Sequence, residues 1–459
     1  MAGNVKKITA TIVMGTTTAA LVVGCGTSTG NTSSNTSSTA ATTNSALSNS
    51  TSGSTSSPVD YSHASGTIVW AAPPITHTGL RKALIAAFEK QYPNIKVTLQ
   101  EQNSDTDTDR ASLTTAISGG AATPDVYMGD VVWPAQFASA SLAQPLSDVL
   151  PSSFFDRFSD GLVQGATYNG KVFAAPFFVD TAFLFYRKDL LKKVGLPVPT
   201  TWEQLESEAQ QIQKSGGAEY GFVWQGGDYE GGTCNFVEYL ADAGGQVLNN
   251  NQGALTSQAA NKALTFMQSL IKTGVSPKAV DTFQEADAEN TFTQGKSVFL
   301  RNWSYAWSDS QNAKNSKVVG EVGVAPLPTF QGSGSNGYSC VGGWDLYVNP
   351  HTKNMAATLQ FIDWMTGKDA QTILGKQFSE IPTNKEVATD PALKSVSPVF
   401  SNLTNIKYTS RPSQTPDYPK VSKAIYDNVN QALSGGASVS DALNNANNQI
   451  NSALNSKGL

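Results

Sequence analysis

Beyond about residue 66, short apolar runs alternate with stretches in which apolar residues recur every three to four positions. Residues 67–70 form an apolar run before Pro73 and Pro74, which predicts a strand. Residues 80–88 carry their apolar side chains on one helical face, and residues 95–99 predict a second strand. This order predicts two parallel strands joined by a helix.

The same alternation continues toward the carboxyl end of the chain. Its predicted strands lie at 125–128 and 181–187. Its predicted helices lie at 109–118, at 188–194 before Gly195, from about 199–203, and at 259–273, 286–293, 355–366 and 420–432. We therefore expect an α/β fold in which helices cover a parallel sheet. About 400 residues follow Asp60, more than one core usually serves, so two lobes are expected.

The amino-terminal segment has a different pattern. Lys6 and Lys7 precede the apolar, threonine-interrupted residues 8–24, and Gly24 stands directly before Cys25. This arrangement resembles the lipobox of bacterial lipoproteins, which implies that residues 1–24 are a cleaved signal peptide and that Cys25 carries acyl chains. The alternative is an ordinary signal peptide with a chance cysteine.

Residues 26–59 contain no charged side chain and consist almost entirely of Ser, Thr, Asn, Gly and Ala. Such a composition buries too little apolar surface to offset the entropy of ordering. We expect residues 25–60 to be a flexible stalk that tethers the protein to the extracellular face of the cell membrane.

Composition narrows the choice of partners. The formal net charge is −5, which argues against a nucleic-acid partner. Charged residues make up 15% of the chain, below the roughly 25% of typical soluble domains. This sparse charge hints at an acidic medium, or it reflects the bias of the lineage. The three histidines are isolated and lack metal-ligand spacing, so no metal site and no cofactor are expected.

The aromatic and polar residues suit carbohydrate recognition. A pyranose offers hydroxyls that donate and accept hydrogen bonds beside apolar C–H patches, so a site for it combines planar polar groups with aromatic faces. Asp130 would lie at the carboxyl end of a strand, where open α/β sheets bind ligands. The candidate aromatics, each of which could instead be a core residue, are Trp133, Trp224, Tyr229, Trp303, Trp307 and Trp344.

Several short phrases, in this order, resemble the extracellular solute-binding proteins of ABC sugar importers, in the branch that binds maltose and trehalose. They lie at 124–130, 177–180 with 184–191 and 201–203, 292–296, 301–307 and 342–344. The resemblance covers nearly everything after Gly66.

The resemblance implies two α/β lobes of discontinuous segments, with a ligand cleft between them, that close about a hinge. Crossings near Val179, Gly295 and Val348 would assign 66–178 and 297–347 to the first lobe, and 179–296 and 348–459 to the second. Cys234 and Cys340 would then lie in different lobes as free thiols. The implied function is capture of an extracellular di- or oligosaccharide, of maltose, trehalose or maltodextrin type, by a monomer that delivers it to an ABC permease. The protein would not be an enzyme.

The resemblance also implies site residues. Trp303 and Trp344 stand where this branch contributes stacking aromatics, and Gly343 belongs to the same phrase as Trp344. Asp180 would contact a sugar hydroxyl at the hinge, and Arg411 would reach the cleft from the second lobe. The last candidate is Arg110, which could equally be a solvated helix residue.

One departure leaves the preferred sugar open. Close relatives often carry an acidic residue after the first strand, whereas residues 71–76 contain none. Two other classes remain as alternatives: a lipid-anchored glycoside hydrolase, which would use an Asp/Glu pair with the same aromatics, and a surface adhesin on a stalk.

Overall fold

The computed structural model describes residues 58–74, 79–334 and 336–455. The predicted signal peptide, the acylation site Cys25 and the stalk up to residue 57 lie outside these residues.

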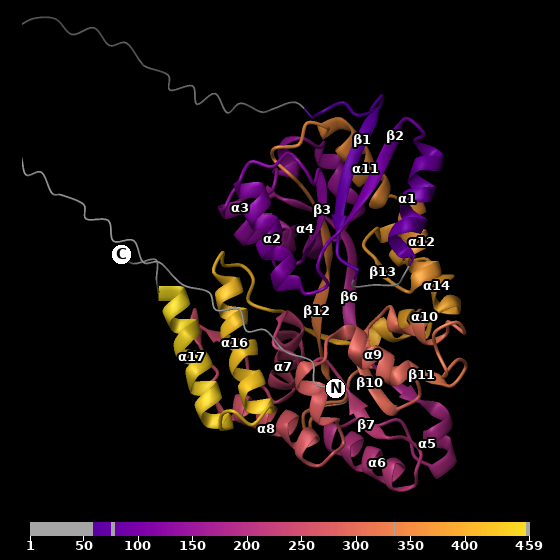
Figure 1. Ribbon diagram of the computed structural model, residues 1–459, viewed down its shortest axis with the longest axis vertical. Coiled ribbons are helices and arrows are strands. Elements are labelled where there is room, and N and C mark those ends of the chain that lie inside the picture. The colour runs from indigo at the N-terminus through magenta and orange to yellow at the C-terminus, as the bar shows by residue number, and fades with distance from the viewer. Residues whose placement is uncertain (1–57, 75–78, 335, 456–459) are drawn as a thin grey trace, which may run out of the picture. The chain divides into compact units, whose positions relative to one another are not determined.

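The strand-helix-strand pattern at the start of the described chain forms one side of a mixed sheet (Figure 1). β1 (Gly66–Ala72) pairs in parallel with β2 (Ile95–Glu101) and with β3 (Val126–Asp130). β12 (Tyr338–Val348) is antiparallel to β3. It also pairs with β6 (Ala174–Arg187), so the strand order here is β2-β1-β3-β12-β6.

β6 continues into a second group of strands. Its carboxyl half is antiparallel to β10 (Ser297–Trp303) and to β11 (Val322–Ala325). β10 pairs in parallel with β7 (Tyr220–Val223). The short β13 (Ile381–Pro382) pairs with β6, and β14 (Lys407–Thr409) pairs with the first residues of β12. β6 and β12 therefore run through both groups, as Figure 1 shows.

Helices pack against the first group of strands. α1 contacts β2, α11 contacts β1, and α12 contacts α1. Phe88 and Phe361 meet edge to face with ring centroids 5.0 Å apart, in a core that also holds Trp70. The helices in this part are α1 (Leu80–Gln91), α2 (Thr106–Ser118), α3 (Pro134–Ser139), α4 (Asp160–Gly165), α11 (Met355–Met365) and α12 (Lys368–Phe378).

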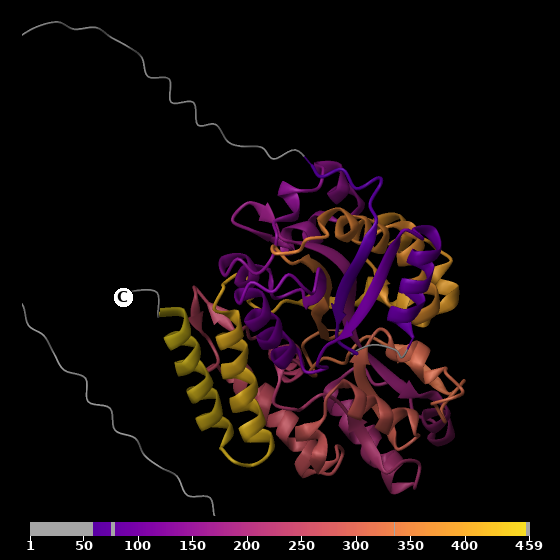
Figure 2. The ribbon, with the colours of Figure 1, turned by 45° about the horizontal axis from the view of Figure 1, so that its top comes forward.

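A second set of helices packs around β7, β10 and β11. α7 contacts α8, α16 and β12, and the paired α16 and α17 form the yellow edge in Figures 1 and 2. These helices are α5 (Lys188–Val194), α6 (Trp202–Lys214), α7 (Glu230–Asp242), α8 (Gln258–Lys272), α9 (Glu285–Thr293), α10 (Ala306–Ser310), α16 (Tyr418–Leu433) and α17 (Val439–Asn455).

Shorter elements complete the described chain. Two small hairpins are formed by β4 (Thr167–Tyr168) with β5 (Lys171–Val172) and by β8 (Leu248–Asn249) with β9 (Gln252–Gly253). The short helices are α13 (Lys385–Ala388), α14 (Leu393–Val396) and α15 (Pro398–Asn402). The 3-10 turns are Leu146–Asp148, Ser152–Arg157, Lys278–Thr282 and Leu403–Asn405.

The predicted α/β fold class is confirmed, and most predicted elements appear within a few residues of their expected bounds. The helix predicted at 188–194 is α5, closed by Gly195 in a left-handed conformation (φ 70°). The strand predicted at 181–187 is only the second half of β6, which begins at Ala174. Pro176 hides this extension from sequence reasoning, because proline is unusual inside a sheet.

The strand pairing disagrees with part of the expected lobe division. Residues 297–347 were grouped with 66–178, yet β10 pairs with β7 and with the carboxyl half of β6. Residues 348–459 were grouped with the other lobe, yet α11 and α12 contact β1 and α1. The physical reason is that the chain crosses between the groups within the continuous strands β6 and β12, and not at Gly295 or Val348.

The two cysteines are free and buried. They do not lie in different parts of the fold, as the expected division placed them. Cys340 stands where β12 pairs with β14, and its backbone N–H donates to Oε1 of Glu238 in α7, the helix that carries Cys234 (3.0 Å).

Among residues 58–74, 79–334 and 336–455, no helix is long and apolar enough to cross a membrane. The same residues contain no group of three or more His, Cys, Asp or Glu arranged to hold a metal ion.

Candidate functional site

A small cavity lies where β3, β6, β10 and β12 meet the first residues of α2, α7 and α9. Its volume is about 50 Å³. The cavity brings together six of the predicted ligand-binding residues, and the candidate aromatic Tyr229 also lines it. The six are Asp130, Asp180, Trp303, Gly343, Trp344 and Arg411. Arg110 is not among its lining residues. It pairs one helical turn away with Asp107 in α2 (Nη2 to Oδ1, 3.1 Å).

Asp130, Glu230 and Arg411 form a buried ion cluster, called here the arginine cluster. The guanidinium of Arg411 donates to both carboxylate oxygens of Asp130, at 3.0 and 3.1 Å, and to Oε1 of Glu230 at 2.8 Å. It also donates to the carbonyl oxygen of Val341. Paired contacts of this kind fix a guanidinium in one plane. Arg411 therefore ties the end of β3 to the first residue of α7.

Glu230 is further held by two hydroxyls. The Tyr418 hydroxyl donates to Oε1, and the Ser422 hydroxyl donates to Oε2 at 2.6 Å. Burial raises the pKa of Glu230 to about 7, because desolvation penalises the carboxylate more than the contact with Arg411 favours it. Sequence reasoning missed Glu230, since two glycines directly after it obscure the start of α7.

Asp180 and Glu380 form the second charged feature, called here the acid pair. Ser304 bridges them: its hydroxyl lies 2.8 Å from Oδ1 of Asp180 and 3.3 Å from Oε2 of Glu380. The backbone N–H groups of Thr181 and Ser304 also donate to Asp180. Burial raises the pKa of Asp180 to about 7, and burial with the neighbouring Asp180 raises the pKa of Glu380 well above its ordinary value. A shared proton is the natural state of such a pair.

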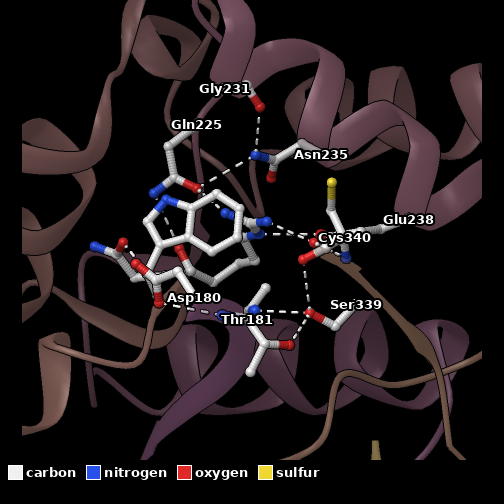
Figure 3. Close-up of polar contacts among 12 residues, drawn as sticks. Asp180, Thr181, Gln225, Gly231, Asn235, Glu238, Ser339 and Cys340 are labelled. Atoms are coloured by element: carbon white, nitrogen blue, oxygen red, sulfur yellow. Dashed lines mark hydrogen bonds and ion pairs between the residues drawn. The ribbon is translucent and has the colours of Figure 1, made fainter. Parts of the chain in front are cut away.

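Trp303 stands at the end of β10 with one edge and one face of its ring engaged. Its indole N–H donates to Oε1 of Glu285 (3.2 Å), and the guanidinium carbon of Arg301 lies 4.0 Å from its ring centroid. Arg301 is in turn held by Glu238 and by the side-chain oxygen of Gln225 (2.9 Å). Figure 3 shows Glu238 and Gln225 beside Asp180 and Thr181 in this network. The Trp303 ring is therefore held in place before any ligand arrives.

Trp344 and Gly343 line the cavity from β12. The Trp344 ring meets Trp133 edge to face, with centroids 6.2 Å apart, and only 6% of Trp344 is exposed. Gly343 has φ 129°, and a Cβ atom there would lie 2.4 Å from the Phe178 carbonyl oxygen. Only glycine allows this close approach of β12 to β6. Trp133 and Trp224 are buried among core residues, as the alternative interpretation expected.

Two further polar residues of the cavity, Glu285 and Thr106, were not predicted as ligand-binding residues. Glu285 accepts from the Tyr229 hydroxyl at 2.8 Å as well as from Trp303. The Thr106 hydroxyl is buried and has no hydrogen-bond partner among the described residues. Glu285 and Thr106 are the first residues of α9 and α2, and this helix-start position is the signal that sequence reasoning could have used.

Comparison with known proteins identifies the family. The sequence pattern of the bacterial extracellular solute-binding proteins matches residues 75–372. A probable ABC transporter-binding protein of Deinococcus radiodurans is 34% identical over 71% of this chain and 79% of its own length.

Solved structures agree with that match. The maltose-bound T. maritima MalE3 superposes with a TM-score of 0.78 and 34% identity, over 84% of this chain and 98% of that chain. The GacH receptor of Streptomyces glaucescens was solved unliganded and with acarbose. It superposes with a TM-score of 0.75 and 25% identity, over 85% of this chain and 98% of that chain. The chain therefore belongs to the bacterial extracellular solute-binding protein family.

Proposed function

We propose that this protein captures an extracellular di- or oligosaccharide, of maltose, trehalose or maltodextrin type, and delivers it to an ABC permease. The observation that carries the proposal is a cavity in which Trp303 and Trp344 lie beside the arginine cluster and Asp180. Aromatic faces suit the C–H patches of a sugar, and planar charged groups suit its hydroxyls. The maltose bound to the T. maritima relative and the acarbose bound to GacH support this ligand class.

The cavity is too small for such a ligand as it stands. Its volume of about 50 Å³ holds several water molecules, whereas pockets for small molecules begin near about 300 Å³. We propose that the lobes open to admit the sugar and close around it, as hinged binding proteins do. The hinge would lie where β6 and β12 pass from one group of strands to the other, near Thr181 and Val341.

The pairing suggests revised lobes for this motion. One would contain β1, β2 and β3 with α11 and α12, and the other would contain β7, β10 and β11 with α7 and α16. In this arrangement Arg411 bonds to both sides, since Asp130 ends β3 and Glu230 begins α7. Arg411 would then bond to Asp130 and Glu230 at the same time only when the lobes are closed.

We propose that the sugar is released unchanged. Asp130 and Glu230 are held by the same guanidinium, so neither carboxylate is free to act as a nucleophile or as a general base. Asp180 accepts three hydrogen bonds through a single oxygen, which positions it for binding.

Calorimetric titration of the purified protein with maltose, trehalose, sucrose and longer maltodextrins tests the proposal. At least one should bind at a single site and raise the melting temperature, because a ligand of the native state stabilises it by mass action. The bound sugar should be recovered intact. Glucose released above a heat-killed control, or no binding by any sugar of this panel, would contradict the proposal.

We also propose that the protein is a monomer anchored through lipid on Cys25. The support is the sequence at 21–25 and the charge-free stretch at 26–59. Replacing Cys25 by Ala should move the protein from the membrane fraction into the culture medium, because the acylation site is removed. Fractionation with immunoblotting measures this, and a variant that stays on the membrane would refute the anchor.

A further inference from the structure

A second cavity, larger than the first, adjoins the same strands. Its volume is about 380 Å³, which lies within the range of about 300 to 1,000 Å³ typical of small-molecule sites. Gly342 and Arg411 line both cavities, whereas residues of α4 and the loop residues Ser410, Ser413 and Gln414 line only the second. The function proposed above does not use this space.

The two cavities share Gly342 and Arg411, and otherwise have different walls. Asp180 and Trp344 line the first cavity, while their chain neighbours Val179 and Asp345 line the second. A ligand in the second cavity would therefore contact a different set of side chains from the sugar.

Asp345 is the feature that indicates a ligand. Only 4% of this residue is exposed, it lines the second cavity, and its carboxyl has no hydrogen bond or ion pair with any described residue. Its oxygens therefore open onto the cavity, where a ligand can bond to them. Burial, with Asp130 adding to it, raises the pKa of Asp345 to about 8, so the carboxyl is largely protonated at neutral pH. A protonated carboxyl both donates and accepts, which matches an alcohol.

The rest of the lining narrows the ligand class. Leu162, Val131 and Phe178 supply apolar surface, and Ser413 and Gln414 supply further hydrogen-bonding groups. The guanidinium of Arg411 on the same wall is already paired with Asp130 and Glu230, so it offers little positive charge to an anionic ligand. We propose that this cavity is a second binding site, for a neutral polyhydroxylated molecule of about monosaccharide size, with the Asp345 carboxyl bonded to its hydroxyls.

The site can be filled without disturbing the fold. Gly165, in the wall of the cavity at the end of α4, would place a new Cβ with no atom within 4 Å. Gly165→Leu should therefore fill part of the cavity. Gln164→Leu is the matched control, because it adds the same side chain at an exposed neighbour that does not line the cavity.

Equilibrium dialysis of the mature protein with labelled glycerol and D-mannitol tests the site. At least one polyol should bind saturably, and Gly165→Leu should weaken that binding by about tenfold or more while Gln164→Leu leaves it unchanged. Asp345→Ala should weaken it by about tenfold, because the paired hydrogen bonds are lost. Asp345→Asn, which retains a donor and an acceptor, should stay within about threefold of the wild type. Circular dichroism and melting temperature establish that each variant folds.

Trp303→Ala separates this site from the sugar cavity, because Trp303 lines only the first. Polyol binding that survives Trp303→Ala and falls in the Gly165 and Asp345→Ala variants supports the second site. Absence of saturable binding by both polyols overturns it, whether or not the sugar panel binds. Polyol binding that is lost in Trp303→Ala and kept in Gly165→Leu also overturns it, because the polyol then occupies the sugar cavity.

Discussion

Asp130 and Glu230 share the guanidinium of Arg411, whereas Asp180 and Glu380 share only the hydroxyl of Ser304. Both pairs are buried and line or adjoin the same cavity. In the arginine cluster a cation offsets the charge of two carboxylates. In the acid pair protons must do so, because no cation bonds to either carboxyl among the described residues.

Because of this difference, the arginine cluster and the acid pair contribute differently to binding and to stability. A buried cluster that contains its own counterion is held in one geometry by its ion pairs, which suits a fixed contact with a ligand. A carboxyl pair that depends on protons makes stability depend on pH. The two regions therefore predict different responses to mutation.

The largest effect is expected from Arg411→Met, which leaves two buried carboxyls without their counterion. The free energy of unfolding at pH 7 should fall by about 3 to 5 kcal/mol. The loss should shrink at pH 5, where protons can replace the guanidinium, since burial raises the pKa of Glu230 to about 7. Urea denaturation at both pH values measures this.

Lys420→Met is the matched control, since it also removes a cation from an ion pair. Lys420 bonds to Asp417 at the surface, where 64% of the lysine side chain is exposed. Its loss should cost less than about 1 kcal/mol. If both variants lose the same stability, the arginine cluster is not the stabilising centre described above.

Trp303→Ala should weaken sugar binding by about 2 kcal/mol or more, because a buried aromatic of the contact surface is removed. Calorimetry with the best-binding sugar measures the change. Trp307→Ala is the control: it removes the same side chain four residues along, outside the cavity. Equal losses of affinity in the two variants would argue against the assigned cavity.

Glu380→Gln should flatten the dependence of stability on pH. Burial raises the pKa of Asp180 to about 7 in the folded protein, above its ordinary value of 3.8. Its stabilisation is therefore complete below about pH 4 and is lost as the pH rises through about 7. Glu380→Gln removes one proton-binding group. It also removes the negative charge beside Asp180 that disfavours a second carboxylate there, so less proton uptake accompanies folding.

The slope of the unfolding free energy against pH should become less negative by up to about 1.4 kcal/mol per pH unit, the value for one proton. Asp156→Asn, a change at an exposed acid, should leave the slope unaltered. A slope in Glu380→Gln that matches the wild type would show that the acid pair does not share protons as described.

The smallest effect is expected from Arg110→Ala. Arg110 pairs with Asp107 on its own helix and does not line the cavity, so sugar affinity should change by less than about 0.5 kcal/mol. Calorimetry measures this as well. A loss of sugar affinity as large as that in Trp303→Ala would show that Arg110 belongs to the binding site.

Local sequence patterns predicted the helices and strands more reliably than they predicted the division of the chain into lobes. The helix at 188–194 was predicted to the residue, because Gly195 marks its end. The carboxyl end of β3 placed Asp130 at the cavity for a general reason, since open sheets bind ligands there. The lobe boundaries are harder to predict, because β6 and β12 run through both groups of strands without a loop between them.

The polar residues of the site that were not predicted also depend on contacts that local patterns do not encode. Glu230 and Glu380 become partners of Arg411 and Asp180 only through tertiary packing, at sequence separations of 181 and 200 residues. No local pattern encodes such a contact. The second cavity likewise combines residues that lie far apart in the sequence, such as Leu162, Asp345 and Gln414.

The most direct test of the sugar-binding account is a crystal structure of the mature protein with the best-binding sugar of the calorimetric panel. The account predicts an intact sugar in the cavity, packed against Trp303 and Trp344, with hydroxyls bonded to Asp180 and to the arginine cluster. A sugar bound elsewhere, or one in contact with neither tryptophan, would contradict it.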